Sequence, residues 1–427
     1  MLETNYKEKQ KKILKSTKFF FNINFEQNYQ DLYYLSTWSK NCGNFLLRKK
    51  FLSNGFLFNL IESFKLLYRK IRVENTSYNF IKNFSEKKKR KLNLIISYQG
   101  DKNKNIDTYF SSNRKKSKNS IWLIINLAES IQSLDYDSII LNRKSRGSKF
   151  LALATAILYY PIWVLKAKKS IFENLFFTKL DQLINELPTQ DITRVFLPYE
   201  AQPFQKFLIN KLKKKNKKIN IIGYAHGGLP SLPLEYFYNK KIYKFYVHSL
   251  IEKKILTNNL GWDKKKIQVT KSFRFTKKSK IKKNLIYLPL SFTLNRKLII
   301  DIQHLSRKYC LKNFKVINHP SMFDSKKHKI LKGIVDNLIK ISNNKGQTPN
   351  NISIFIGVTG SILEGLQNGI NIVHIMNNPE FELYSNYLWK DFLINKMSER
   401  IYLYKLKRGN TLIQYSKENY FIKKFNL

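Results

Sequence analysis

The stretch ISIFIGVTGS at residues 352–361 decides the fold, because an uncharged apolar run ends on a glycine and a hydroxyl-bearing turn follows at the start of an expected helix. A second run, FKVINHP at 314–320, leads directly into His319 and Pro320. Open α/β sheets bind ligands outside the carboxyl ends of their strands, where N–H groups at helix N-termini attract anions. The two stretches therefore predict a nucleotide pocket.

Strands and helices are expected to alternate on both sides of these stretches, which is typical of parallel βαβ units. The apolar runs predict strands at 92–98, 195–197, 219–224, 245–248, 285–288, 314–318, 352–357 and 370–375, with helices at 204–212, 250–260, 294–309, 329–341 and 361–368. The runs at 121–127 and 138–141 fit either a strand or a buried helix. We expect an α/β protein of the GT-B arrangement, two Rossmann-like domains facing across a cleft. The expected boundaries are 1–270 for the N-terminal domain, 271–283 for a basic linker and 284–427 for the nucleotide-binding domain.

In the N-terminal unit, polar residues follow the strands. Glu200 comes after the strand that ends at Leu197, and His226 comes after the strand at 219–224, followed by two glycines that allow close approach of a ligand. A carboxylate or an imidazole at that edge can serve as the general base on an acceptor hydroxyl. The alternative is that Glu200 pairs with a lysine and His226 closes a turn.

In the C-terminal unit, His319 can donate to a phosphate oxygen and stabilise a departing nucleotide, and Pro320 fixes the backbone after it. An ordinary surface histidine is the alternative. The turn after the strand at 352–357 can hold phosphate through its backbone donors and hydroxyls, and it consists of Thr359, Gly360 and Ser361. Glu364, three residues after Ser361, fits either a contact near a ribose or a capping box.

The charge of the chain is strongly positive. There are 78 Lys and Arg against 29 Asp and Glu, which gives a net charge of +49. Such a surface attracts phosphorylated sugars, lipid headgroups or nucleic acid. A basic nucleic-acid-binding protein is therefore one alternative, although the aromatic residues lie mostly within apolar segments and no nucleic-acid motif is found. We expect no specific nucleic-acid partner.

Cysteine content and hydropathy indicate a cytoplasmic protein. Cys42 and Cys310 are far apart and form no CxxC pair, and the first 18 residues carry charges throughout, unlike a signal peptide. The longest uncharged run, 150–165, is 16 residues long, shorter than the about 20 that a spanning helix needs. A buried helix is favoured there, and an element at the membrane interface is the alternative. Because of that alternative, peripheral contact with an anionic membrane is also expected.

The motifs also resemble those of a known group of enzymes. The segments LPYEAQPF at 197–204 and IGYAHG at 222–227 resemble bacterial surface-carbohydrate biosynthesis proteins of the GT-B fold. His319-Pro320 and the turn at 359–361 resemble the motifs of bacterial sialyltransferases, polysialyltransferases and capsule-synthesis enzymes. A similar His-Gly pair and a later His-Pro pair occur in CDP-glycerol glycerophosphotransferases. The resemblance covers about residues 195–376.

The resemblance implies a glycosyltransferase that moves a sugar from a nucleotide-activated donor, CMP-linked by preference, to a growing surface polysaccharide, lipopolysaccharide or lipid-linked glycan. It implies that His319 assists departure of the nucleotide, that Thr359 and Ser361 bind its phosphate, and that Glu200 or His226 is the base. A CDP-polyol phosphotransferase of the same fold is the alternative. Lysine-rich surroundings and helix dipoles can neutralise the phosphate, so we expect neither a metal nor another cofactor.

Overall fold

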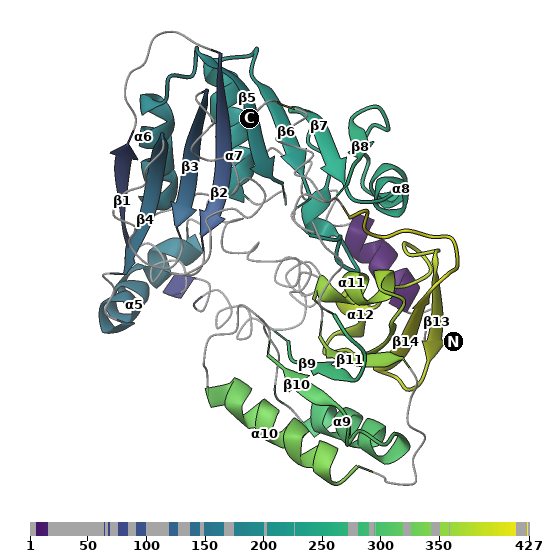
Figure 1. Ribbon diagram of the computed structural model, residues 1–427. Helices are drawn as coiled ribbons and strands as arrows, with labels where there is room; N and C mark the ends of the chain where they lie inside the picture. The colour runs from purple at the N-terminus through teal and green to yellow at the C-terminus, as the bar shows by residue number, and fades with distance from the viewer. Residues whose placement is uncertain are drawn as a thin grey trace.

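The computed structural model describes residues 6–15, 64, 67–68, 76–83, 91–99, 119–126, 137–145, 149–165, 175–199, 203–225, 227–271, 281–289, 294, 296–318, 326–342, 351–357, 359–415 and 425. These residues form two sheets with helices beside them, one sheet in each of two lobes (Figure 1). The first lobe holds the strands up to residue 269, and the second lobe holds the strands from residue 285 onward.

The first sheet has the strand order β1-β4-β3-β2-β5-β6-β7-β8. Its strands are β1 Thr76–Asn83, β2 Leu92–Gln99, β3 Ser120–Asn126, β4 Ser138–Ser145, β5 Ile192–Pro198, β6 Asn220–Tyr224, β7 Ile242–Val247 and β8 Ile267–Val269. All neighbouring pairs are parallel except β1 with β4. Counted from β2, the six central strands follow the order 3-2-1-4-5-6, which is that of a Rossmann fold with its switch point between β2 and β5.

The second sheet has the order β10-β9-β11-β12-β14-β13. Its strands are β9 Leu285–Tyr287, β10 Lys315–Ile317, β11 Ile352–Ile356, β12 Asn371–Ile375, β13 Phe392–Lys396 and β14 Ile401–Leu406. The first four are parallel, and β14 and β13 extend the sheet in antiparallel pairing. The parallel part has the order 2-1-3-4, so its switch point lies between β9 and β11.

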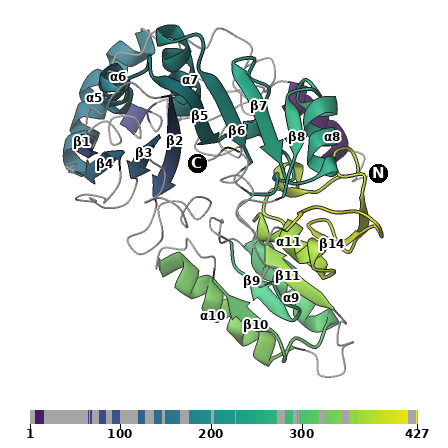
Figure 2. The ribbon, with the colours of Figure 1, turned by 45° about the horizontal axis from the view of Figure 1, so that its top comes forward.

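The helices connect the strands. They are α5 Lys149–Leu165, α6 Leu175–Glu186, α7 Pro203–Lys215, α8 Leu250–Asn259, α9 Arg296–Lys308, α10 Lys326–Lys340, α11 Ser361–Gln367 and α12 Pro379–Glu382, with a short 3-10 turn at Leu234–Tyr236. In both views α11 lies between the two sheets, whereas α9 and α10 cover the opposite side of the second sheet (Figures 1 and 2). The second sheet is thus covered on both faces, which is why β11 is buried along its whole length.

The two lobes share one hydrophobic core. A single cluster of buried side chains runs from the first sheet through α11 to the second sheet, and it includes Tyr199, Phe245, Leu363 and Trp389. The side chain of Ser231 donates to the carbonyl of Phe381 at 2.7 Å, and the indole N–H of Trp389 donates to the carbonyl of Ser231 at 2.9 Å. Buried hydrogen bonds of this kind fix the loop of one lobe onto the other.

The two ends of the chain cross between the lobes. In the helix at 6–15, Gln10 donates to the carbonyl of Leu383 at 2.9 Å, so this N-terminal segment contacts the second lobe. Near the other end, Phe425 lies 5.1 Å, ring to ring, from Phe196 of the first lobe. The domain boundaries at 270 and 283 stay a prediction, and residues 272–280 of the expected linker lie outside the described part of the chain.

The expected α/β fold class with two Rossmann-like sheets is confirmed. The two ambiguous runs form strands β3 and β4 rather than buried helices. The hairpin of β13 and β14 was not predicted, although three of the five residues of β13 and five of the six residues of β14 are apolar or aromatic. The predicted cleft stays a prediction.

The expectation of a buried helix at 150–165 is wrong. The helix forms as α5, but Phe150 and Leu158 are 80% and 72% exposed. The run is uncharged, which suggested a helix buried in the core. Most of the large side chains of α5 point outward instead. Within the described parts of the chain, no helix combines the length and hydropathy required to cross a membrane.

Candidate functional site

Three strand ends meet at the switch point of the second sheet. Gly357 follows β11, Pro289 follows β9, and Asn377 follows β12. A β-carbon added to Gly357 would lie 3.1 Å from Cβ of Pro289 and 3.3 Å from Nδ2 of Asn377. Gly357 also has a φ of +72°, a conformation that favours glycine. We call Pro289, Gly357 and Asn377 the carboxyl edge of the second sheet.

The side chain of His374 holds the backbone carbonyl of Gly357 in place. Its Nε2 lies 3.0 Å from the carbonyl oxygen of Gly357, and its Nδ1 lies 3.4 Å from the hydroxyl of Tyr404. Burial lowers the pKa of His374 to about 3, and the bond to Gly357 opposes that shift. The imidazole is therefore neutral at pH 7, and its Nε2–H donates to the carbonyl. His374 thus supports the strand end structurally.

The turn after Gly357 leads into α11. The N-cap of α11 is Gly360, which makes no side-chain capping bond, and the N–H of Ser361 donates to Oγ1 of Thr359 at 3.3 Å. Ser361 is the first helical residue, so the capping box expected as one alternative for Glu364 does not form. Glu364 is partly buried on α11 and acts electrostatically on the Tyr287 hydroxyl of β9.

The loop after β6 belongs to the first lobe. Its anchor is Glu252 of α8, a buried carboxylate. Oε1 of Glu252 accepts the N–H of Leu229 at 3.0 Å, and Oε2 accepts the N–H of His248 at 2.7 Å. Burial raises the pKa of Glu252 to about 7, while the backbone N–H groups of Leu229, His248 and Ser249 oppose the shift. Glu252 thus ties the end of β7 to the loop that begins at His226.

This loop touches α11 directly. A β-carbon added to Gly228 would collide with Cδ1 of Leu363, which is buried. Only a glycine allows the backbone to approach the helix this closely. In the sequence Gly228 is two residues after His226, and Leu363 is two residues after Ser361. The meeting of the two halves of the predicted site stays a prediction.

The predicted residues divide into two groups. Thr359, Gly360, Ser361 and Glu364 are described, and they lie at and just beyond the carboxyl edge of the second sheet. The other four lie outside the described residues, and they are Glu200, His226, His319 and Pro320.

Backbone pairing locates the strands that lead to these four residues. Tyr199 donates its N–H to the carbonyl of Tyr224 at 3.0 Å, and Leu288 donates to the carbonyl of Ile317 at 2.9 Å. Strand β10, which ends two residues before His319, is separated from β11 only by β9. Two strand spacings correspond to about 10 Å. Strand β10 therefore ends at the same edge of the sheet as β11, and the place of His319 at that edge stays a prediction.

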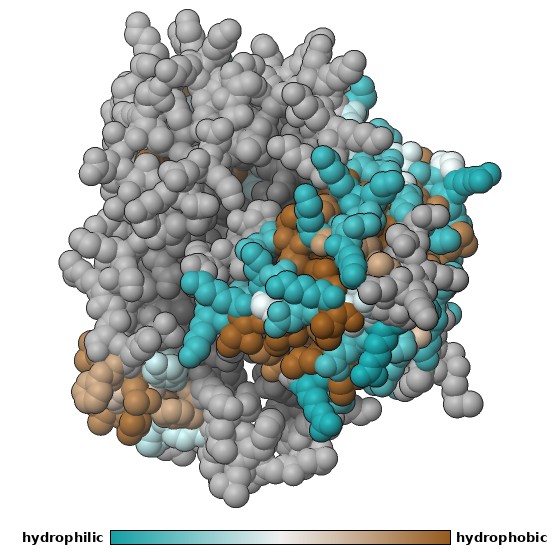
Figure 3. Space-filling view, turned by 60° about the horizontal axis from the view of Figure 1, so that its bottom comes forward, coloured by the Kyte–Doolittle hydropathy of each residue, from teal (hydrophilic) through white to brown (hydrophobic). Residues whose placement is uncertain are grey.

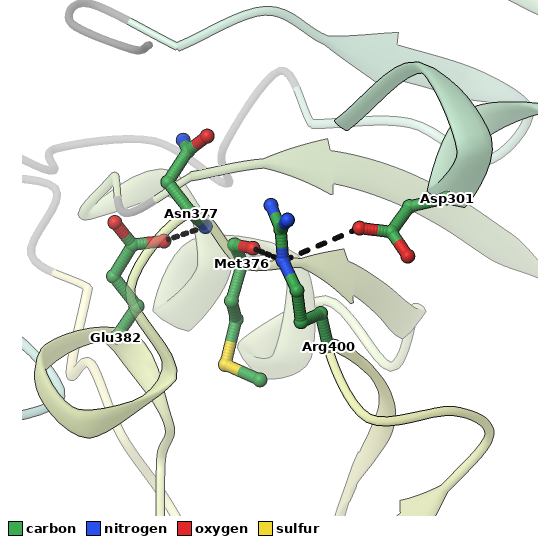
Figure 4. A network of polar contacts seen from close by, with 5 residues as sticks. All are labelled: Asp301, Met376, Asn377, Glu382 and Arg400. Carbon is green, nitrogen blue, oxygen red and sulfur yellow. Dashed lines mark hydrogen bonds and ion pairs between the residues drawn. The ribbon is translucent and has the colours of Figure 1, made fainter. Parts of the chain in front are cut away.

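Sequence reasoning missed a polar network at the end of β12, which Figure 4 shows. The N–H of Asn377 donates to Oε2 of Glu382 at 2.8 Å, and Nε of Arg400 donates to the carbonyl of Met376 at 2.9 Å. The same Nε lies 3.3 Å from Oδ2 of Asp301. This network holds Asn377 at the carboxyl edge. The rule that singled out the residues after β11 would have found Asn377 had it also been applied to the strand at 370–375.

Burial raises the pKa of Asp301, and the positive charge of Arg400 opposes that shift.

Within the described residues, no group of three or more His, Cys, Asp or Glu side chains is placed to hold a metal ion.

Comparisons with known proteins add little to this geometry. No family model matches the chain, and no curated protein sequence matches it. Among solved structures, a UDP-N-acetylglucosamine 2-epimerase aligns with 68% of this chain and 81% of its own, at 10% identity and a TM-score of 0.36. A glycosyltransferase from Rickettsia africae ESF-5 aligns with 68% of this chain and 81% of its own, at 14% identity and a TM-score of 0.33. These scores are too low to carry the fold or the function, which rest on the strand order and the geometry above.

Proposed function

We propose that the chain is a glycosyltransferase that uses a nucleotide-activated sugar. The observation that carries the proposal is the contact between Gly228 and Leu363, which joins the acceptor-side loop of the first lobe to the helix that follows the carboxyl edge of the second sheet. A switch point is where open α/β sheets bind nucleotides, and a second Rossmann-like lobe beside it supplies groups for a second substrate. The surplus of positive charge favours a phosphorylated donor.

In the proposed reaction, an acceptor hydroxyl attacks the anomeric carbon of the donor sugar. The new bond joins the acceptor oxygen to that carbon, and the bond between the carbon and the nucleotide phosphate oxygen breaks. The hydroxyl proton passes to Glu200 or His226. The negative charge that develops on the phosphate is stabilised by His319 and by donors of Thr359, Gly360 and Ser361, with Pro320 fixing the backbone beside His319. In this proposal Glu364 contacts the ribose.

The motif resemblance favours a CMP-linked donor and, as acceptor, a growing capsule polysaccharide, lipopolysaccharide or lipid-linked glycan. The purified protein should be assayed for nucleotide release and product mass with CMP-, CDP-, UDP- and GDP-linked donors. We expect turnover with one nucleotide class and a product heavier by one sugar. A product heavier by a polyol phosphate would replace the proposal with a phosphotransferase.

The role of His319 can be tested by His319→Ala. We expect turnover to fall about 100-fold or more, because loss of one donor to a developing oxyanion typically has an effect of that size. The matched control is His304→Ala, since His304 is an exposed histidine of the same lobe on α9. Its activity should match that of the unmodified protein. Equal turnover in both variants would remove His319 from the mechanism.

Metal independence is part of the proposal, because lysines and arginines can neutralise the phosphates in place of a divalent ion. Turnover should be unchanged after dialysis against EDTA. Activity that disappears with EDTA and returns with Mg²⁺ or Mn²⁺ would contradict this part.

A further inference from the structure

Helix α5 exposes large apolar side chains over most of its circumference. The exposed fractions are 80% for Phe150, 72% for Leu158, 58% for Ile157 and 56% for Leu151. Leu153, Tyr159 and Ile162 are each about 40% exposed. The helix forms a brown patch at the lower left of Figure 3. Contiguous apolar surface of this kind on a folded protein marks an interaction site.

The side of α5 that faces the protein carries small residues. Ala152 and Ala156 are fully buried, and they form a small cluster with Leu67 and the partly buried Phe64 and Tyr160. The rings of Phe64 and Tyr160 meet edge to face at 5.4 Å. A helix that only completes a core turns its large apolar residues inward. Here they point away from the protein, so they are available to a partner.

The length of α5 fits a helix that lies along a membrane. Its 17 residues correspond to about 25 Å, which is less than the about 30 Å of a bilayer core, and Pro161 interrupts it. One stripe is attached to the protein by Ala152 and Ala156, so the axis cannot leave the surface of the lobe. Only the exposed side of α5 can insert into a membrane.

The charges around α5 identify the partner as anionic. No Asp or Glu occurs between Asp137 and Glu173. In the sequence, basic residues precede and follow the uncharged run of the helix, and they are Arg143, Lys144, Arg146, Lys149, Lys166, Lys168 and Lys169. An exposed apolar helix between basic stretches of the sequence matches the boundary between acyl chains and anionic headgroups. It fits a second copy of the chain poorly, because the basic stretches of two copies would repel each other.

We propose that α5 is a docking helix for an anionic lipid bilayer, into which Phe150, Ile157 and Leu158 insert. The helix begins four residues after β4 ends, so it starts at the same edge of the first sheet where β5 delivers Tyr199. Docking through α5 therefore turns the acceptor side of the first lobe toward the membrane. That last consequence rests on the proposed function; docking itself does not.

The test is flotation of the purified full-length protein with vesicles of phosphatidylcholine and phosphatidylglycerol, at 0.05 and 0.5 M NaCl. Any protein of charge +49 binds anionic vesicles at low salt, so the informative measurement is at high salt. The test variant is Phe150→Ser with Leu158→Ser. The matched control is Ile341→Ser with Leu250→Ser, which removes two apolar side chains that are 75% and 62% exposed elsewhere. Melting curves establish that both variants fold.

We expect the unmodified protein and the control to stay bound at 0.5 M NaCl, and the α5 variant to bind about tenfold more weakly or worse. This follows because the variant removes two large apolar side chains from the inserted face, and the lost burial of either one alone weakens binding about tenfold or more. Full release of the unmodified protein at high salt would overturn the proposal, as would equal binding by the α5 variant. A lipid-free dimer in analytical ultracentrifugation that only the α5 variant loses would assign the face to a second copy instead. No donor or acceptor enters the assay, so its outcome is independent of the glycosyltransferase proposal.

Discussion

At the scale of single residues, Glu252 shows how a buried carboxylate can position a site without touching substrate. Its two oxygens accept the backbone N–H groups of Leu229 and His248. In Glu252→Gln one oxygen becomes an amide donor and one N–H loses its acceptor, which costs about 1–3 kcal/mol. We expect urea unfolding to show this loss, and transfer activity to fall because the loop bearing Gly228 is released. Glu8→Gln, at an exposed ion pair with Lys11, should change neither. Unchanged stability of the Glu252 variant would contradict this role.

Two buried groups give the stability opposite dependences on pH. His374 has a pKa of about 3 in the folded protein against the usual 6.5, so the unfolded chain binds the extra proton and stability falls as pH drops below 6.5. Glu252 has a folded pKa of about 7 against 4.5, so its contribution is complete below pH 4.5 and is lost as pH rises toward 7. Between pH 4.5 and 6.5 the two effects oppose each other.

Replacing His374 should isolate its own share of the pH dependence of stability. In His374→Gln the amide can still donate to the carbonyl of Gly357, but the group no longer titrates. The stability of the unmodified protein relative to this variant should therefore fall by about 1.4 kcal/mol for each pH unit below 6.5. Urea unfolding at pH 7, 6 and 5 measures the difference. A difference that stays constant over this range would show that His374 is not held neutral.

At the scale of elements, the contact of the loop after β6 with α11 joins the lobes. In Gly228→Ala the new methyl group collides with Leu363, which is buried, and overpacking of this kind costs about 1–3 kcal/mol. In a Leu363→Ala background the same substitution should cost almost nothing, since the space is then free. The control is Gly333→Ala in the interior of α10. No atom lies within 4 Å of the added carbon, so this substitution should raise the free energy of unfolding by about 1 kcal/mol. Equal costs of Gly228→Ala in both backgrounds would refute the contact.

The strands were predictable from sequence where burial covers both faces. The run at 352–356 is apolar but for one serine because helices cover the sheet on both sides, and the rule for ligands at strand ends then located the turn at 359–361. The same reasoning failed for helix α5, because an apolar run alone does not indicate whether its side chains lie in the protein core or on the surface. The capping alternative at Ser361 failed since Ser361 is the first residue of α11 and Gly360, which has no side chain, is its N-cap. Asn377 was missed because the strand-end rule was not applied to the run at 370–375, while the part played by Arg400 in its network depends on the fold.

At the scale of the whole molecule, the lobes are held together by one continuous core and by chain ends that cross. Gln10 binds the second lobe and Phe425 packs on the first, so neither lobe is closed by residues of its own sheet alone. Removal of residues 1–15 should expose the backbone around Leu383, where the carbonyl loses the Gln10 donor and keeps only the N–H of Ser385, and where the hydroxyl of Ser385 loses its acceptor. We expect a lower melting temperature and, if the lobes depend on this tie, weaker donor binding. A truncated protein with unchanged melting would contradict that dependence.

The central claim is that one nucleotide lies between the carboxyl edge of the second sheet and the loop that follows His226. Hydrogen–deuterium exchange of the full-length protein, with and without CMP, CDP, UDP and GDP, tests it most directly. With at least one nucleotide, peptides covering 227–232 in the first lobe and 357–364 in the second should exchange more slowly, while α10 stays unchanged. If none of the four protects either segment, or protection falls only on segments remote from both, the account is wrong.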